Sequence, residues 1–135
     1  LDTSVLLAAC GSSRGASREL FHRATATHWS LLATPYVTRE VSANLNKLPP
    51  DASDTWTHLR TSLRIFPDVL TLNLPSVFAP AKDRPILFSA LAWADLSLTL
   101  DQADFQSLLG TSFYGLLIMK PGAFLQRERT AGRLP

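Results

Sequence analysis

The chain has 135 residues, 46% of them apolar, which suffices for one folded domain with a sizeable core and excludes a disordered segment. No apolar run approaches the roughly 20 residues of a membrane-spanning helix, and we expect neither a membrane partner nor a signal peptide. A single cysteine, Cys10, excludes an internal disulfide and fits a cytoplasmic protein. The net charge of +2 is too small to indicate a nucleic-acid ligand by itself.

The first ten residues read as the end of a strand that leads into a helix. Asp2 is followed by two hydroxyl residues that can cap a helix, and then by the apolar run 5–10. Because the strand end comes so early, we expect most of a first strand, in the middle of a parallel sheet, to lie before Leu1.

The later segments alternate between helical and strand patterns. Apolar residues at spacings of three and four predict helices at residues 17–24, 36–48, 54–66 and 82–93. Short apolar or alternating runs predict strands at residues 31–33, 69–74, 96–100 and 116–119. A helical turn is expected at residues 105–109, and a short basic tail begins at Phe124. This alternation predicts a single α/β domain over residues 1–135, with a parallel sheet covered on both faces.

Four acids stand where strands should end or helices begin: Asp2, Glu40, Asp83 and Asp101. Asp104 follows three residues after the last of them. Each has a local explanation, because acids at these places cap helices and turns or interact with the helix dipole. A parallel sheet, however, brings the carboxyl ends of its strands to one edge, so we expect these carboxylates to lie together.

Gathered carboxylates repel one another, and at least one of them then tends to keep a proton. A divalent cation removes this cost, and Mg²⁺ or Mn²⁺ suits a site built from carboxylate oxygens. One metal activates a water molecule, and two metals can stabilise both reacting oxygens of a phosphodiester. The histidines His22, His28 and His58 lack paired ligand spacing, which disfavours zinc.

Five segments share order and spacing with the motifs of a known family. They are LDTSVLL (1–7), TPYVTREV (34–41), KDRPILFSAL (82–91), ADLSLTLDQADF (94–105) and KPGAFL (120–125). Together they resemble the PIN-domain family of metal-dependent nucleases. The resemblance assigns metal binding and catalysis to Asp2, Glu40, Asp83 and Asp101, with Asp104 as a further metal ligand. Ser4 departs from the family pattern, which often has asparagine at this position.

The resemblance implies a three-layer α/β/α sandwich with a central parallel sheet, of which the first strand is truncated here. It also implies a Mg²⁺ or Mn²⁺ site and endoribonuclease activity on RNA. Many small bacterial members are VapC-type toxins that a cognate antitoxin inhibits, and many form homodimers. We therefore expect RNA, an antitoxin and a second copy of the chain as partners.

Several polar residues near the acids are candidates for substrate binding. Ser4 can donate a hydrogen bond to a phosphate or a metal-bound water, or simply cap its helix. The basic candidates for phosphate contacts are Arg14, Arg18, Arg39, Lys82 and Arg84. Basic side chains give affinity for any nucleic-acid backbone, but they also serve as surface charges or as ion-pair partners of the acids.

Two other functions fit parts of the sequence. Phosphatases of the haloacid-dehalogenase kind also begin with an aspartate at a strand end, but they need a second aspartate two residues later, where this chain has Ser4. A non-catalytic PIN-like module that binds RNA or protein is the stronger alternative, and failure of the acids to bind Mn²⁺ would favour it.

Overall fold

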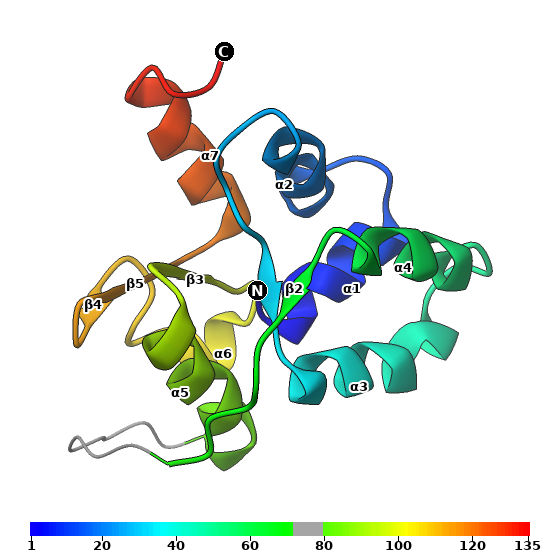
Figure 1. Cartoon of the computed structure of the whole chain (residues 1–135), viewed down its shortest axis with the longest axis horizontal. Coiled ribbons are helices and arrows are strands. Elements are labelled where there is room, and N and C mark those ends of the chain that lie inside the picture. The colour runs from blue at the N-terminus through cyan, green and yellow to red at the C-terminus, as the bar shows by residue number, and fades with distance from the viewer. Residues whose placement is uncertain (72–79) are drawn as a thin grey trace.

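The computed structural model describes residues 1–71 and 80–135 and is a mixed α/β structure in which helices predominate (Figure 1). The α-helices are α1 (Thr3–Gly11), α2 (Ala16–Ala24), α3 (Pro35–Asn44), α4 (Ala52–Arg60), α5 (Arg84–Trp93), α6 (Gln102–Phe105) and α7 (Pro121–Thr130). The strands are β1 (Leu32–Ala33), β2 (Arg64–Ile65), β3 (Leu96–Leu98), β4 (Ser112–Phe113) and β5 (Leu116–Met119). Short 3-10 helices, η1 (Leu45–Lys47) and η2 (Ala81–Asp83), extend α3 and precede α5.

The strands form two small sheets. Strand β1 pairs with β2 in parallel, and β5 lies between β3, its parallel neighbour, and β4, its antiparallel neighbour. The prediction of parallel pairing is therefore confirmed for β3–β5. The β1–β2 pair is also parallel, but residues 64–65 were expected to be helical. A single central sheet is not seen in the described part of the chain, and β4 adds an antiparallel strand that the sequence analysis missed.

Leu1 and Asp2 link the two sheets. The Leu1 amino group donates a hydrogen bond to the Leu32 carbonyl of β1 at 2.7 Å, and the Asp2 amide donates to the Leu98 carbonyl of β3 at 2.9 Å. Consecutive residues of a parallel strand bond alternately to the two neighbouring strands. Leu1 and Asp2 thus follow the pattern of a strand between β1 and β3.

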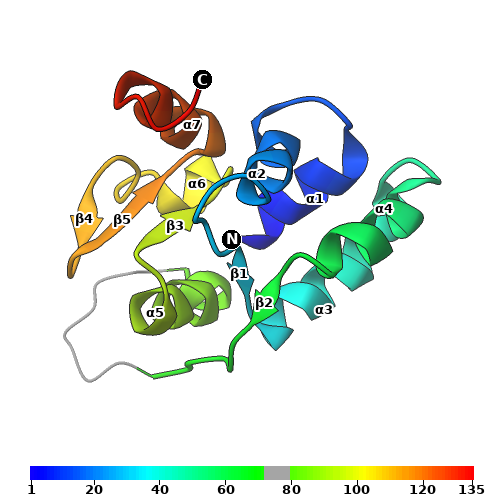
Figure 2. The same cartoon turned by 45° about the horizontal axis from the view of Figure 1, so that its top comes forward.

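Helices cover both faces of the β3–β5 pair (Figure 2). On one face, Ile118 of β5 packs in a core cluster with Leu87 of α5. On the other face, Leu98 of β3 packs with Leu125 of α7 and with Leu20 of α2. This pair of strands therefore has the layered arrangement expected of an α/β domain, with its apolar side chains alternating between two cores.

A third core cluster joins the start of the chain to α3 and α4. It contains Leu6 of α1, Val41 of α3 and Trp56 of α4, and Ala33 of β1 lies against the same side chains. This packing holds the N-terminus of α1 beside that of α3. No helix in residues 1–71 or 80–135 has the length and apolar character required to cross a membrane.

Two local predictions were wrong. The helix expected at residues 54–66 ends at Arg60, because the amides of Arg64 and Phe66 donate instead to the carbonyls of Leu31 and Ala33. The segment beginning at Phe124 is not a basic tail but lies within α7, which buries Leu125 against the core. The helical turn expected at 105–109 is confirmed, because the Leu109 amide donates to the Phe105 carbonyl, and α6 precedes this turn.

Other boundaries differ by a few residues. The strand expected at 96–100 ends at Leu98, although the Thr99 amide still donates to the Met119 carbonyl of β5. Of the strand expected at 69–74, residues 69–71 are not in a strand, and residues 72–74 lie outside the described residues.

Candidate metal centre

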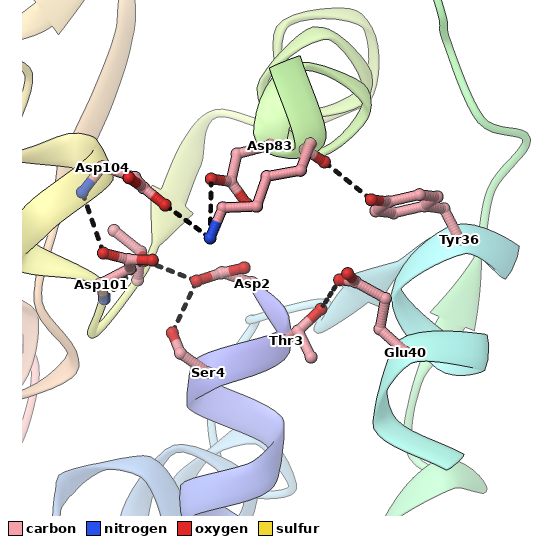
Figure 3. A network of polar contacts seen from close by, with 10 residues as sticks. Asp2, Thr3, Ser4, Tyr36, Glu40, Asp83, Asp101 and Asp104 are labelled. Carbon is pink, nitrogen blue, oxygen red and sulfur yellow. Dashed lines mark hydrogen bonds and ion pairs between the residues drawn. The ribbon is translucent and has the colours of Figure 1, made fainter. Parts of the chain in front are cut away.

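The predicted acids lie near the N-termini of four helices, which face one another in Figure 3. Asp2 immediately precedes α1, Asp83 precedes α5 and Asp101 precedes α6. Asp104 is in the first turn of α6, and Glu40 comes from α3. Because helix N-termini carry a partial positive charge, this arrangement reduces part of the repulsion among the gathered carboxylates.

Three of these carboxylates form a tight cluster. Asp83, Asp101 and Asp104 each offer an oxygen, and these oxygens lie within 4.8 Å of one another. Asp83 is only 8% exposed, and among the described residues its Oδ2 has no hydrogen-bond partner. Burial raises the pKa of Asp83 to about 7, and the nearby carboxylates of Asp104 and Asp2 add to this effect. Asp83 is therefore partly protonated near neutral pH, and a divalent cation in the cluster would favour its ionised form.

Lys82 supplies the nearest positive charge to this cluster. Its Nζ lies 2.7 Å from Oδ2 of Asp104 and 3.9 Å from Oδ2 of Asp83. The hydrogen bond from Lys82 lowers the pKa of Asp104, and the same bond raises the pKa of Lys82. The backbone carbonyl of Lys82 accepts a hydrogen bond from the Tyr36 hydroxyl at 2.7 Å, which ties the start of α5 to α3.

Asp2 is held in place by two hydroxyl groups. Its Oδ2 accepts hydrogen bonds from Ser4 Oγ and Thr99 Oγ1, both at 2.6 Å, and the residue is only 4% exposed. The two hydroxyls in turn accept from the amides of Leu100 and Asp101, at 3.0 Å each. Ser4 thus orients Asp2 rather than capping α1, and Thr99 connects Asp2 to the start of α6.

Glu40 is linked to the site through Thr3. The Thr3 hydroxyl donates to Oε2 of Glu40 at 2.6 Å (Figure 3). The first two residues of α1, Thr3 and Ser4, therefore contact Glu40 and Asp2 respectively. Glu40 is not part of the three-carboxylate cluster. Its expected place in the first turn of a helix is wrong, because α3 begins at Pro35 and Glu40 lies in the second turn. The helix-dipole explanation for this acid is therefore weak.

For Asp101, the expected role in capping a turn through its own side chain is confirmed. Its Oδ1 accepts a hydrogen bond from the Asp104 amide at 3.0 Å, which caps α6. By contrast, neither Asp2 nor Asp83 makes a side-chain capping bond, although both occupy capping positions. Capping thus accounts for one oxygen of one acid in the cluster and leaves the gathering of the other carboxylates unexplained.

The arginines that were candidates for phosphate contacts lie in different environments. The guanidinium of Arg18 donates through Nε and Nη2 to the Ala9 carbonyl, at 2.8 and 2.6 Å, and so binds the C-terminal turn of α1. This contact overturns the interpretation of Arg18 as a phosphate ligand. Arg14, Arg39 and Arg84 are exposed, and the last two adjoin Glu40 and Asp83 in the chain.

Sequence reasoning missed two residues that organise the site. Thr99 is fully buried, and a polar residue at the end of an apolar strand was the only signal for it. Tyr36 stands beside the acids. Burial raises the pKa of its hydroxyl, and the negative charges of Glu40 and Asp83 add to this effect. A tyrosine in the first turn of α3 carries no signal of its own for this role.

The donor set fits a hard divalent cation. Carboxylate oxygens are the ligands that Mg²⁺ and Mn²⁺ prefer. Among the described residues the buried Oδ2 of Asp83 accepts no hydrogen bond, and the Lys82 ammonium, 3.9 Å away, compensates its charge only in part. Within the described residues, no cluster of histidine and cysteine competes with this site.

Comparison with known proteins adds no assignment. No family model, no curated protein and no solved structure matches this chain.

Proposed function

We propose that this protein is a Mg²⁺- or Mn²⁺-dependent endoribonuclease that hydrolyses RNA phosphodiester bonds. One observation carries the proposal: Oδ2 of Asp83 is buried without a hydrogen-bond partner inside a cluster of three carboxylates. A buried carboxylate that accepts no hydrogen bond and is 3.9 Å from its nearest ammonium costs free energy, and a bound divalent cation would reduce that cost. The resemblance to the PIN-domain family supports the same activity.

Asp83, Asp101 and Asp104 are the residues that would hold the metal, with Asp2 beside them. A bound divalent cation supplies Lewis-acid polarisation of the phosphate and a more acidic water. Ser4 and Thr99 fix the carboxylate of Asp2 through its Oδ2. Thr3 positions the carboxylate of Glu40 beside this site.

The phosphate contacts would come from exposed cations next to the acids. Arg39 and Arg84 flank Glu40 and Asp83 in the sequence and reach solvent. Such contacts bind any nucleic-acid backbone and weaken with salt. The choice of RNA, the role of toxin in a type II toxin–antitoxin pair, a homodimer and a complete three-layer sandwich all rest on the family resemblance alone.

The phosphatase alternative is disfavoured by the contact that Ser4 makes. A second aspartate at this position would act as an acid or base, whereas the Ser4 hydroxyl donates to Asp2. The Ser4 hydroxyl also accepts a hydrogen bond from the Leu100 amide, so it is engaged both as a donor and as an acceptor within the protein.

Cleavage of an end-labelled single-stranded RNA tests the proposal, with single-stranded DNA of the same sequence beside it. We expect RNA cleavage with Mg²⁺ or Mn²⁺, none with EDTA, and a loss of at least about 100-fold in Asp83→Asn and Asp101→Asn. Asp95→Asn is the matched control, because Asp95 is exposed and immediately precedes β3, whereas Asp101 follows that strand. Cleavage that persists in EDTA or in both site variants would contradict the proposal.

A non-catalytic module that binds RNA or protein is the second candidate. The ion pair between Lys82 and Asp104 favours it, because a protein cation already compensates part of the acidic charge. Calorimetric titration with Mn²⁺ separates the two functions. Measurable binding that Asp83→Asn removes supports the enzyme, and no binding to well-folded protein supports the module.

A further inference from the structure

We infer that Lys82 is a resident counter-ion that a divalent metal must displace from the carboxylate cluster. This inference rests on the metal site proposed above. The Lys82 ammonium lies 2.7 Å from Asp104 Oδ2 and 3.9 Å from Asp83 Oδ2, two of the residues that would bind the metal. A metal and the ammonium therefore compete for the same oxygens.

The ammonium can leave this position without disturbing the fold. The Lys82 side chain is 67% exposed, so its flexible stem can turn into solvent. The backbone of Lys82 stays in place, because its carbonyl accepts the hydrogen bond from Tyr36. Asp83, next in the chain, is buried and remains in the cluster when the lysine turns away.

Displacement would link metal binding to substrate binding. In the metal-free protein the ammonium is paired with Asp104 and is not available to a phosphate. Once displaced, it stands beside the site as a free cation that can contact the phosphate backbone of a nucleic acid. Lys82 thus lowers metal affinity in the absence of substrate and adds a phosphate contact in its presence, a reciprocal coupling of the two ligands.

The first test compares Mn²⁺ affinities of the wild type, Lys82→Met and Lys47→Met by calorimetry at low salt. Because an exposed ion pair is weak, we expect Lys82→Met to bind Mn²⁺ only about three- to fivefold more tightly than the wild type. Lys47→Met is the control, because Lys47 is exposed in η1 and its Nζ donates to Asn44 instead of an acid. Its affinity should equal that of the wild type.

The second test separates displacement from a general effect of charge. In the wild type, the NMR signals of the Lys82 ammonium should shift on titration with Mg²⁺, at the same concentration as the Asp83 carboxyl signal. Equal Mn²⁺ affinity in Lys82→Met and the wild type, or a Lys82 signal that stays unchanged while metal binds, would overturn this inference and leave the metal site standing. Absence of binding in both proteins would overturn the metal site as well.

Discussion

The two sides of the Leu1–Asp2 segment differ in how the fold treats polar groups. On the Asp2 side, hydroxyls and one lysine are placed against carboxylates, and Asp2 itself accepts two hydrogen bonds. On the Leu1 side lies a cavity of about 510 Å³. Two aromatic pairs take part in its walls: Trp29 with Phe124, and Phe66 with Trp93, whose ring centroids lie 4.8 and 5.4 Å apart.

Leu1 lines this cavity, and its nitrogen donates a hydrogen bond to the Leu32 carbonyl. The contrast teaches that one edge of the strands is organised by specific polar contacts among its side chains, which suits a charged ligand. The opposite edge borders a cavity whose walls combine aromatic side chains with charged ones, among them Arg64, Asp95 and Glu128.

The largest effect is expected from Asp2→Ala. The substitution leaves the hydroxyls of Ser4 and Thr99 without their buried acceptor, and hydrogen bonds to a charged group contribute about 1.5–3 kcal/mol. We expect the free energy of unfolding to fall by about 3 kcal/mol in urea titrations with EDTA present. Asp95→Ala, at an exposed position, should change it by less than about 0.5 kcal/mol. Equal stability of the two variants would contradict the role given to Asp2.

Asp83→Asn should stabilise the metal-free protein in a pH-dependent way. The folded-state pKa of Asp83 is raised to about 7, so the wild type loses stability as the pH rises from the unfolded pKa of the carboxyl through this value. The amide cannot ionise and avoids the loss. We expect a gain of about 1 kcal/mol at pH 8, a smaller gain at pH 5, and almost none at pH 3, where the carboxyl is largely protonated in both the folded and the unfolded state. Urea unfolding at pH 3 and pH 8 checks this, and a larger gain at pH 3 would contradict it.

The smallest effect concerns the contact between α1 and α3. Thr3→Val removes the hydrogen bond to Glu40 and should cost about 0.5–1 kcal/mol, together with a loss of RNA cleavage if Glu40 acts in the reaction. Thr57→Val is the matched control, since its exposed hydroxyl bonds only within α4. A stability change no larger than that of the control would mean that Thr3 does not hold Glu40.

Much of the local structure was predictable because it depends on short-range patterns. The period of apolar residues located α2 and α3, and the strand β5 was predicted at its observed bounds. The same period failed after Arg60, because pairing of β2 with β1 is a long-range interaction that competes with the helix. The acids of the site were named from their places at expected element ends, and three of them are gathered in one cluster.

What the sequence determined by itself was therefore the set of elements with clear periodicity and the candidate carboxylates that stand at their ends. Only the tertiary structure decided which oxygens approach one another, that Lys82 pairs with Asp104, and that Ser4 and Thr99 serve Asp2. The physical reason is that these contacts join helix starts from distant parts of the chain. Their geometry depends on how α1, α5 and α6 pack around the strands, and local periodicity contains no information on that packing.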